Sequence, residues 1–79
     1  MNLVSEVWTW QEGNRLYSQL TTNVSTPRLI ARLVALQILE WVETIHAYFG
    51  DRAEGGTGYE VLWKDHVQWD DLQAILIFL

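Results

Sequence analysis

Residues 26–49, TPRLIARLVALQILEWVETIHAYF, constrain the fold most, because they combine helical spacing of apolar residues with signals for a start and a stop. Thr26 is a favourable N-cap, and Pro27 suits the first helical position, where its missing N–H would have no partner anyway. Gly50 is a natural residue just beyond a helix end. The sequence therefore predicts one long helix over 26–49.

The two sides of this predicted helix differ in composition. At 100° per residue one side is wholly apolar, and we expect it to lie on a sheet. Its members are Ile30, Ala31, Val34, Ala35, Ile38, Trp41, Val42, Ile45 and Phe49. The other side mixes leucines with charges, and a single helix on a sheet leaves these leucines uncovered. Exposed apolar stripes of this kind often mark interfaces.

The charge order on the outer side of the helix favours self-association. Arginines precede glutamates, so an antiparallel copy centred on Leu36 brings unlike charges together, as a two-fold interface requires. We call this set the predicted helix interface; it consists of Arg28, Leu29, Arg32, Leu33, Leu36, Leu39, Glu40 and Glu43. We expect it to form a homodimer. Another partner, or cover by the rest of the chain, are the alternatives.

Two alternating segments before the helix predict a β-hairpin over 3–22. Its register decides which way the aromatic residues point, because a slip of one residue turns every side chain to the other face. A two-residue turn at Gly13 and Asn14 gives one face both charges and aromatic rings, as in a binding platform. That face holds Glu6, Trp8, Trp10, Glu12, Arg15, Tyr17 and Gln19.

A three-residue loop over 12–14 gives the other register. The two-residue turn places Trp10 opposite Tyr17, whereas the longer loop places Trp10 opposite Leu16. The longer loop separates apolar from polar residues better, and Asn14 tolerates the left-handed conformation that this loop needs. We therefore favour the three-residue loop and expect Trp8 and Trp10 in the core.

The segments after the helix predict a loop and two strands. Residues 51–58, DRAEGGTG, are typical of an exposed Gly-rich loop, without the GK[ST] of a phosphate site. Alternation in YEVLWK predicts a strand over 59–64. The final segment 72–79, LQAILIFL, is either a buried strand or a helix capped by one of two preceding aspartates. Its last six residues carry no polar group, which favours a strand and hence a C-terminal strand pair over 59–79.

These elements predict one α+β domain over 1–79, with a small, mostly antiparallel sheet in the order ββαββ and one long helix packed across one face. The alternative order is ββαβα, with a C-terminal helix. With 49% hydrophobic residues, the chain is rich enough in apolar side chains to form a core.

Composition limits the function classes. The net charge is −5, with +1 in residues 1–39 and −6 in residues 40–79. An acidic half argues against direct nucleic-acid binding, because phosphate contacts need Lys and Arg, and it suits a basic protein partner. The chain has no cysteine, no recognisable secretory signal and no apolar run long enough to cross a membrane. We therefore expect a soluble cytoplasmic protein.

Residue types that carry catalysis show no recognisable arrangement. His46 and His66 lack HxxxH or HExxH spacing, and no serine lies in a GxSxG context. We expect no enzymatic activity, no cofactor and no metal. A secondary acidic–aromatic patch is a candidate binding surface, since Trp is a frequent interface anchor. It comprises Trp63, Asp65, Trp69, Asp70 and Asp71.

Three functional hypotheses follow. The first is a non-catalytic protein-interaction module that self-associates through the predicted helix interface. The second is an acidic inhibitor, of the type found in phages and mobile elements, that binds the basic surface of a nucleic-acid-binding protein. The third is a binder of small molecules or metal at His46 or His66.

Overall fold

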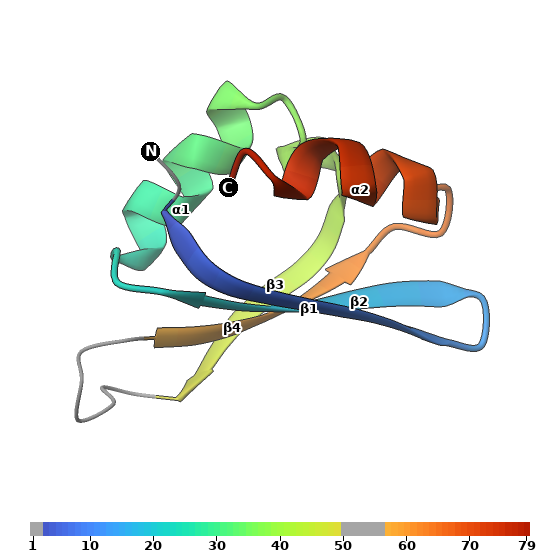
Figure 1. Ribbon diagram of the computed structural model, residues 1–79, viewed down its shortest axis with the longest axis horizontal. Helices are drawn as coiled ribbons and strands as arrows, with labels where there is room; N and C mark the ends of the chain where they lie inside the picture. Colours follow the sequence, from blue (N-terminus) through green and yellow to red (C-terminus); the bar gives the residue numbers. More distant parts are fainter. Residues whose placement is uncertain (1–2, 50–56) are drawn as a thin grey trace.

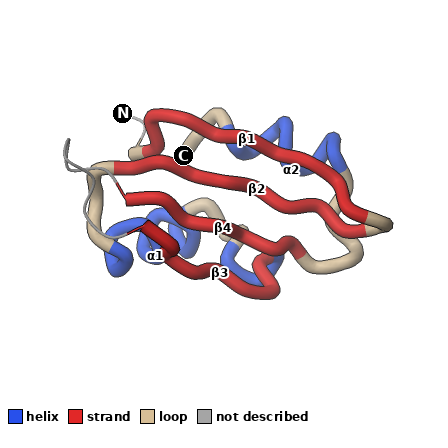
Figure 2. Tube along the Cα trace, turned by 90° about the horizontal axis from the view of Figure 1, so that it is seen from below, coloured by secondary structure: helices blue, strands red, loops and turns tan. Residues whose placement is uncertain are grey.

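The computed structural model describes residues 3–49 and 57–79. Four strands form one antiparallel sheet in the order β1-β2-β4-β3. The strands are β1 (Val4–Glu12), β2 (Arg15–Thr22), β3 (Val42–Phe49) and β4 (Thr57–Trp63). The helices are α1 (Thr26–Ala35), the 3-10 helix η1 (Leu39–Trp41) and α2 (Trp69–Leu76). All three lie on the same side of the sheet (Figures 1 and 2), which confirms the α+β class and the antiparallel sheet.

Helix α1 begins at Thr26, the first residue of the predicted range, but its N-cap is Ser25 rather than Thr26, and it ends at Ala35. The stop is a Schellman motif, in which Gln37 takes the left-handed conformation with φ 61°. Its N–H donates to the carbonyl of Val34 at 2.9 Å, and the N–H of Ile38 donates to that of Leu33 at 3.0 Å. Glycine is the usual residue at this position, so glutamine gave no stop signal in the sequence.

Residues 42–49, predicted as the second half of the long helix, form the edge strand β3. The segment carries Val42, Thr44 and Ile45, and β-branched side chains of this kind favour strands. β3 pairs with β4, so that Ile45 lies opposite Val61. The two strands that follow α1 are therefore β3 and β4. β4 corresponds to the predicted strand over 59–64, whereas β3 takes the place of the predicted strand over 72–79.

The faces of α1 differ from the prediction in part: Ile30 packs against the core and Arg28 is exposed, as expected, but other positions are exchanged. Leu29 and Leu33, expected outside, are fully buried, whereas Ala31, Val34 and Ala35, expected in the core, are exposed. In a helix of ten residues the leucine pair offers more apolar area for burial than the alanines do. The predicted apolar side drew much of its width from residues beyond 35, which are not part of the helix.

The hairpin has the two-residue turn, so the favoured three-residue loop is wrong. Trp10 pairs with Tyr17 and Glu12 with Arg15. Gly13 has φ 62°, the conformation that a type II′ turn needs at its first central position. Trp10 and its neighbour Trp8 therefore point away from the core.

The core lies between the sheet and the helices. Its members are Val4, Leu16, Leu20, Leu29, Leu33, Ile38, Tyr59, Val61, Trp63, Val67, Leu72 and Leu79. Ser18 is also fully buried, and its Oγ accepts a hydrogen bond from Trp63 Nε1 at 2.9 Å. Thr9 Oγ1 lies 2.8 Å from the same Ser18 oxygen. The buried polar groups of this cluster are therefore paired with one another, as buried polar groups must be.

The C-terminal segment forms helix α2, so the predicted strand over 72–79 is wrong and the helical alternative is right. Asp71 accepts a hydrogen bond from the N–H of Gln68 at 2.9 Å as part of a capping box. This capping box outweighs the strand preference of the apolar run that follows it.

Of the predicted Gly-rich loop 51–58, residues 57 and 58 belong to β4, and the rest lies outside the described residues. In the part of the chain that is described, no helix has the length and apolarity to cross a membrane.

Candidate functional site

The side of the sheet that faces away from α1, η1 and α2 forms a broad strand surface (Figure 2). We call it the outer face. The pairing register and the Arg15–Glu43 contact assign to it Glu6, Trp8, Trp10, Glu12, Arg15, Tyr17, Gln19, Thr21, Glu43, Thr44, His46, Glu60 and Leu62. It therefore contains the charged and aromatic hairpin face that the two-residue turn implies. Pairing extends this hairpin face across β4 and β3.

Aromatic rings line the β1–β2 part of the outer face. The rings of Trp10 and Tyr17 stack with centroids 5.6 Å apart and planes 11° from parallel. Such cross-strand aromatic pairs stabilise a sheet and hold both rings in one orientation. Trp8 lies two residues along β1 on the same face, opposite Gln19, and is 63% exposed. The outer face thus presents a large apolar ring beside a rigid aromatic pair.

Two of the four glutamates on the outer face accept hydrogen bonds from other side chains of this face. Trp10 Nε1 donates to Glu12 Oε2 at 2.7 Å. Arg15 Nη2 donates to Glu43 Oε1 at 3.1 Å and to the Trp63 carbonyl at 2.8 Å. The Arg15 side chain therefore reaches from β2 across β4 to β3, and hydrogen bonds to both of these strands fix its guanidinium group.

The outer face is acidic. Its strand positions hold four glutamates against the single Arg15, and the remaining two glutamates, Glu6 and Glu60, are exposed. Glu60 lies between Gln19 and His46 in the same cross-strand row as Trp8. Aromatic faces and carboxylates both attract guanidinium and ammonium groups. The arrangement is suited to binding cationic side chains.

The predicted helix interface is not one surface. Leu29 and Leu33 are in the core, and Leu36 and Leu39 pack against it. Glu43 lies on β3 beside Arg15. The remaining charged members behave differently from one another: Arg28 and Glu40 are exposed, and Arg32 Nη1 donates to the carbonyl of Phe78 at 3.1 Å. Leu36, the predicted centre of the two-fold contact, is the C-cap of α1. The antiparallel pairing predicted around Leu36 needs a helix that continues beyond it, and α1 ends there.

The secondary acidic–aromatic patch is also divided. Trp63 is fully buried, whereas Trp69 is 41% exposed at the start of α2, where its Nε1 donates to Gln11 Oε1 at 3.4 Å. Asp65 and Asp70 are exposed, while Asp71 caps α2. What remains together on the surface is the α2 start, with one Trp and its neighbouring aspartates.

Sequence reasoning assigned the outer face too little weight. The available signal was the Glu12-Gly13-Asn14-Arg15 segment, because the two-residue turn sets unlike charges directly opposite each other. Neither His46 nor His66 belongs to a metal-ligating group: the described residues contain no cluster of three or more His, Cys, Asp or Glu that could hold a metal ion. Comparisons with protein-family models, with curated proteins and with solved structures found no significant match, so function must be argued from the residues of this chain.

Proposed function

We propose that the protein is a non-catalytic interaction module whose outer face binds a basic segment of another protein. The observation that supports this most directly is the 63% exposure of Trp8 beside the stacked Trp10 and Tyr17. Complete burial of a large apolar side chain contributes roughly 1.5–3 kcal/mol, and the partly exposed Trp8 forgoes a share of it. Trp and Tyr are frequent binding anchors. Docking of a partner on this face covers that ring.

Charge decides which class of partner fits. Glu6 and Glu60 lie on two sides of Trp8, one along β1 and the other two strands across. A Lys or Arg side chain over the indole is attracted by the ring and by both carboxylates. The same glutamates repel the negatively charged phosphate backbone of a nucleic acid. The charge of this face therefore favours a basic polypeptide as the partner.

The hypothesis of an acidic inhibitor is a special case of this proposal. A basic surface that normally binds nucleic acid has the charge that the outer face would attract. The homodimer is a separate proposal and concerns the opposite side of the molecule. No feature of the described residues favours the small-molecule or metal hypothesis over these two.

Binding of labelled peptides to the whole protein tests the proposal. We expect a fluorescein-labelled peptide of alternating Arg and Gly to bind, and a Glu–Gly peptide of equal length not to bind, by fluorescence anisotropy. Affinity should fall as salt rises from about 50 to 500 mM, because surface charges are screened. Trp8→Ala should weaken binding at least about tenfold, as expected for an interface anchor.

Trp69→Ala is the matched control, since it removes an exposed Trp from α2 rather than from the outer face. This variant should bind as the wild type does. Equal binding of both peptides, or a loss with Trp69→Ala and none with Trp8→Ala, contradicts the proposal; the second result places binding at the α2 start instead.

A further inference from the structure

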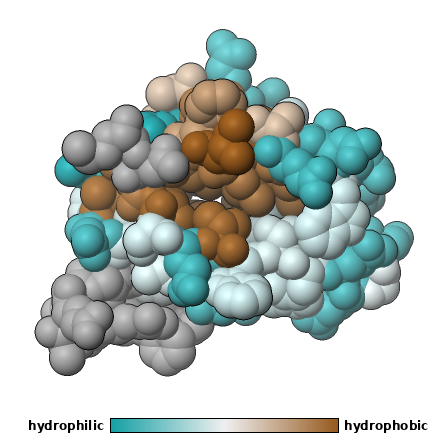
Figure 3. Space-filling model, in the orientation of Figure 1, coloured by the Kyte–Doolittle hydropathy of each residue, from teal (hydrophilic) through white to brown (hydrophobic). Residues whose placement is uncertain are grey.

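The helical side of the molecule carries a second, chemically different surface. Val34 is 55% exposed, Ile77 65% and Phe78 55%, and these are three of the five large hydrophobic side chains that are exposed among those the structure describes. The hydrogen bond from Arg32 to the Phe78 carbonyl brings the chain end against α1. Figure 3 shows apolar side chains gathered over this half of the molecule. We call Ala31, Val34, Ala35, Ile77 and Phe78 the helical patch.

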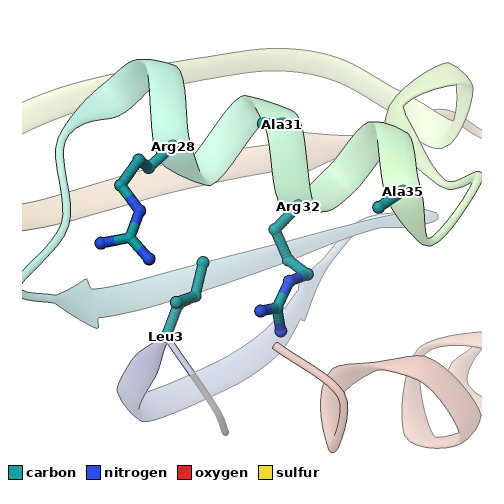
Figure 4. A pocket seen from close by; sticks show the side chains of 5 residues that line it. All are labelled: Leu3, Arg28, Ala31, Arg32 and Ala35. Atoms are coloured by element: carbon teal, nitrogen blue, oxygen red, sulfur yellow. The ribbon is translucent and has the colours of Figure 1, made fainter.

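The helical patch is flanked by two hollows. One, of about 540 Å³, is lined by Val34, Gln37, Leu39 and Glu40. The other, of about 230 Å³, is lined by Leu3, Arg28, Ala31, Arg32 and Ala35 (Figure 4). Ala31 and Ala35 are one helical turn apart and small, so the backbone of another element can approach α1 closely there. Protruding side chains such as Val34 and Phe78 can enter hollows of this size.

The charges beside the two hollows favour a second copy of this chain as the partner. Arg28 lines the smaller hollow and Glu40 the larger one, and both are exposed. A two-fold axis that lies in the contact plane and crosses the line between these residues at its midpoint, at a right angle, exchanges their positions. Each Arg28 then faces Glu40 of the second copy, and the pairing occurs twice. This self-complementarity is what an isologous interface requires, and it differs from the one-signed charge of the outer face.

We propose that the helical patch is the contact surface for a second copy of this chain, with Arg28 of each copy paired to Glu40 of the other. This dimer does not use the buried leucines of the predicted helix interface. It leaves the outer face of each copy open, on the opposite side of the sheet.

Charge exchange between two variants tests this pairing. The wild type should show twice the 9.2 kDa chain mass by light scattering at high concentration and dissociate on dilution. Arg28→Glu carries glutamates at both positions and Glu40→Arg carries arginines at both, so each should dimerise at least about tenfold more weakly alone. Their equimolar mixture should regain dimers of mixed mass by native mass spectrometry, because every pair in the mixed dimer is again of opposite charge.

Glu60→Arg on the outer face is the control, and it should dimerise as the wild type does. Circular dichroism checks that the variants keep their fold, which is expected because all three positions are exposed. A wild type that stays monomeric up to about 1 mM overturns the proposal. Two single variants that dimerise normally, or a mixture no better than its components, also overturn it.

Discussion

Trp63 and Trp8 lie on opposite faces of the same sheet and have opposite environments. Trp63 on β4 is fully buried, and its indole N–H donates to the buried Ser18 hydroxyl. Trp8 on β1 is 63% exposed. Both residues stand in alternating strand sequences, so residue type alone does not assign the face. The register does, and the register of the β1–β2 hairpin follows from the packing of Trp63.

The register that the structure does not adopt explains why the hairpin depends on Trp63. A three-residue loop shifts β1 by one residue and places Trp8 opposite Ser18, where the Trp63 indole already lies. The observed register places Thr9 there instead, and its hydroxyl is 2.8 Å from the Ser18 hydroxyl. A small hydroxyl residue fits beside an indole, whereas a second indole would overpack the core. Trp8 and Trp10 therefore lie on the outer face because the Trp63 indole fills the inner face beside Ser18.

The largest expected effect is that of Trp63→Ala. Removing a fully buried Trp leaves a cavity and should lower the free energy of unfolding by about 3–5 kcal/mol, measured by urea denaturation followed by circular dichroism. For a chain of this size that approaches total loss of the fold. A change below about 1 kcal/mol would show that the inner face is not organised around this indole.

A smaller effect is expected from Ser18→Ala. The change leaves the Trp63 Nε1 donor buried without its acceptor, which should cost about 1–3 kcal/mol in the same urea experiment. Thr9→Val is the control, because Ser18 keeps its bond to Trp63 when Thr9 loses its hydroxyl. Equal losses from both changes would mean that the Thr9 contact, rather than the Trp63 bond, holds the cluster.

The parts of the fold that could be predicted are those set by neighbouring residues. The existence of the hairpin, the start of α1 at Thr26 and a strand near 59–64 follow from local alternation and from Pro27. The end of α1 could not be predicted, because Gln37 adopts the left-handed conformation that glycine usually occupies at a helix end. Packing of Leu33 against the core and the Schellman hydrogen bonds to Gln37 and Ile38 outweigh that local preference.

The candidate site was half predicted. Its residues were named from the two-residue turn, but the choice of register depended on Trp63, which lies more than 40 residues from Ser18 in the sequence. The predicted helix interface failed for a similar reason: Glu43 belongs to a strand, and its partner Arg15 comes from the hairpin. A helical wheel cannot detect contacts that only a sheet creates. Arg28 and Glu40 were rightly expected on the surface, although on a different one from that predicted.

The smallest effect on stability is expected from Trp8→Ala, the same substitution as Trp63→Ala made on the other face. Trp8 is exposed, and surface changes away from caps, cavities and buried pairs usually stay within about 0.5 kcal/mol. The urea midpoint should therefore hardly move, while binding of the Arg–Gly peptide falls at least about tenfold. A loss of stability near that of Trp63→Ala would mean that Trp8 supports the sheet rather than a partner. Separation of the two readouts is the result that distinguishes a binding residue from a structural one.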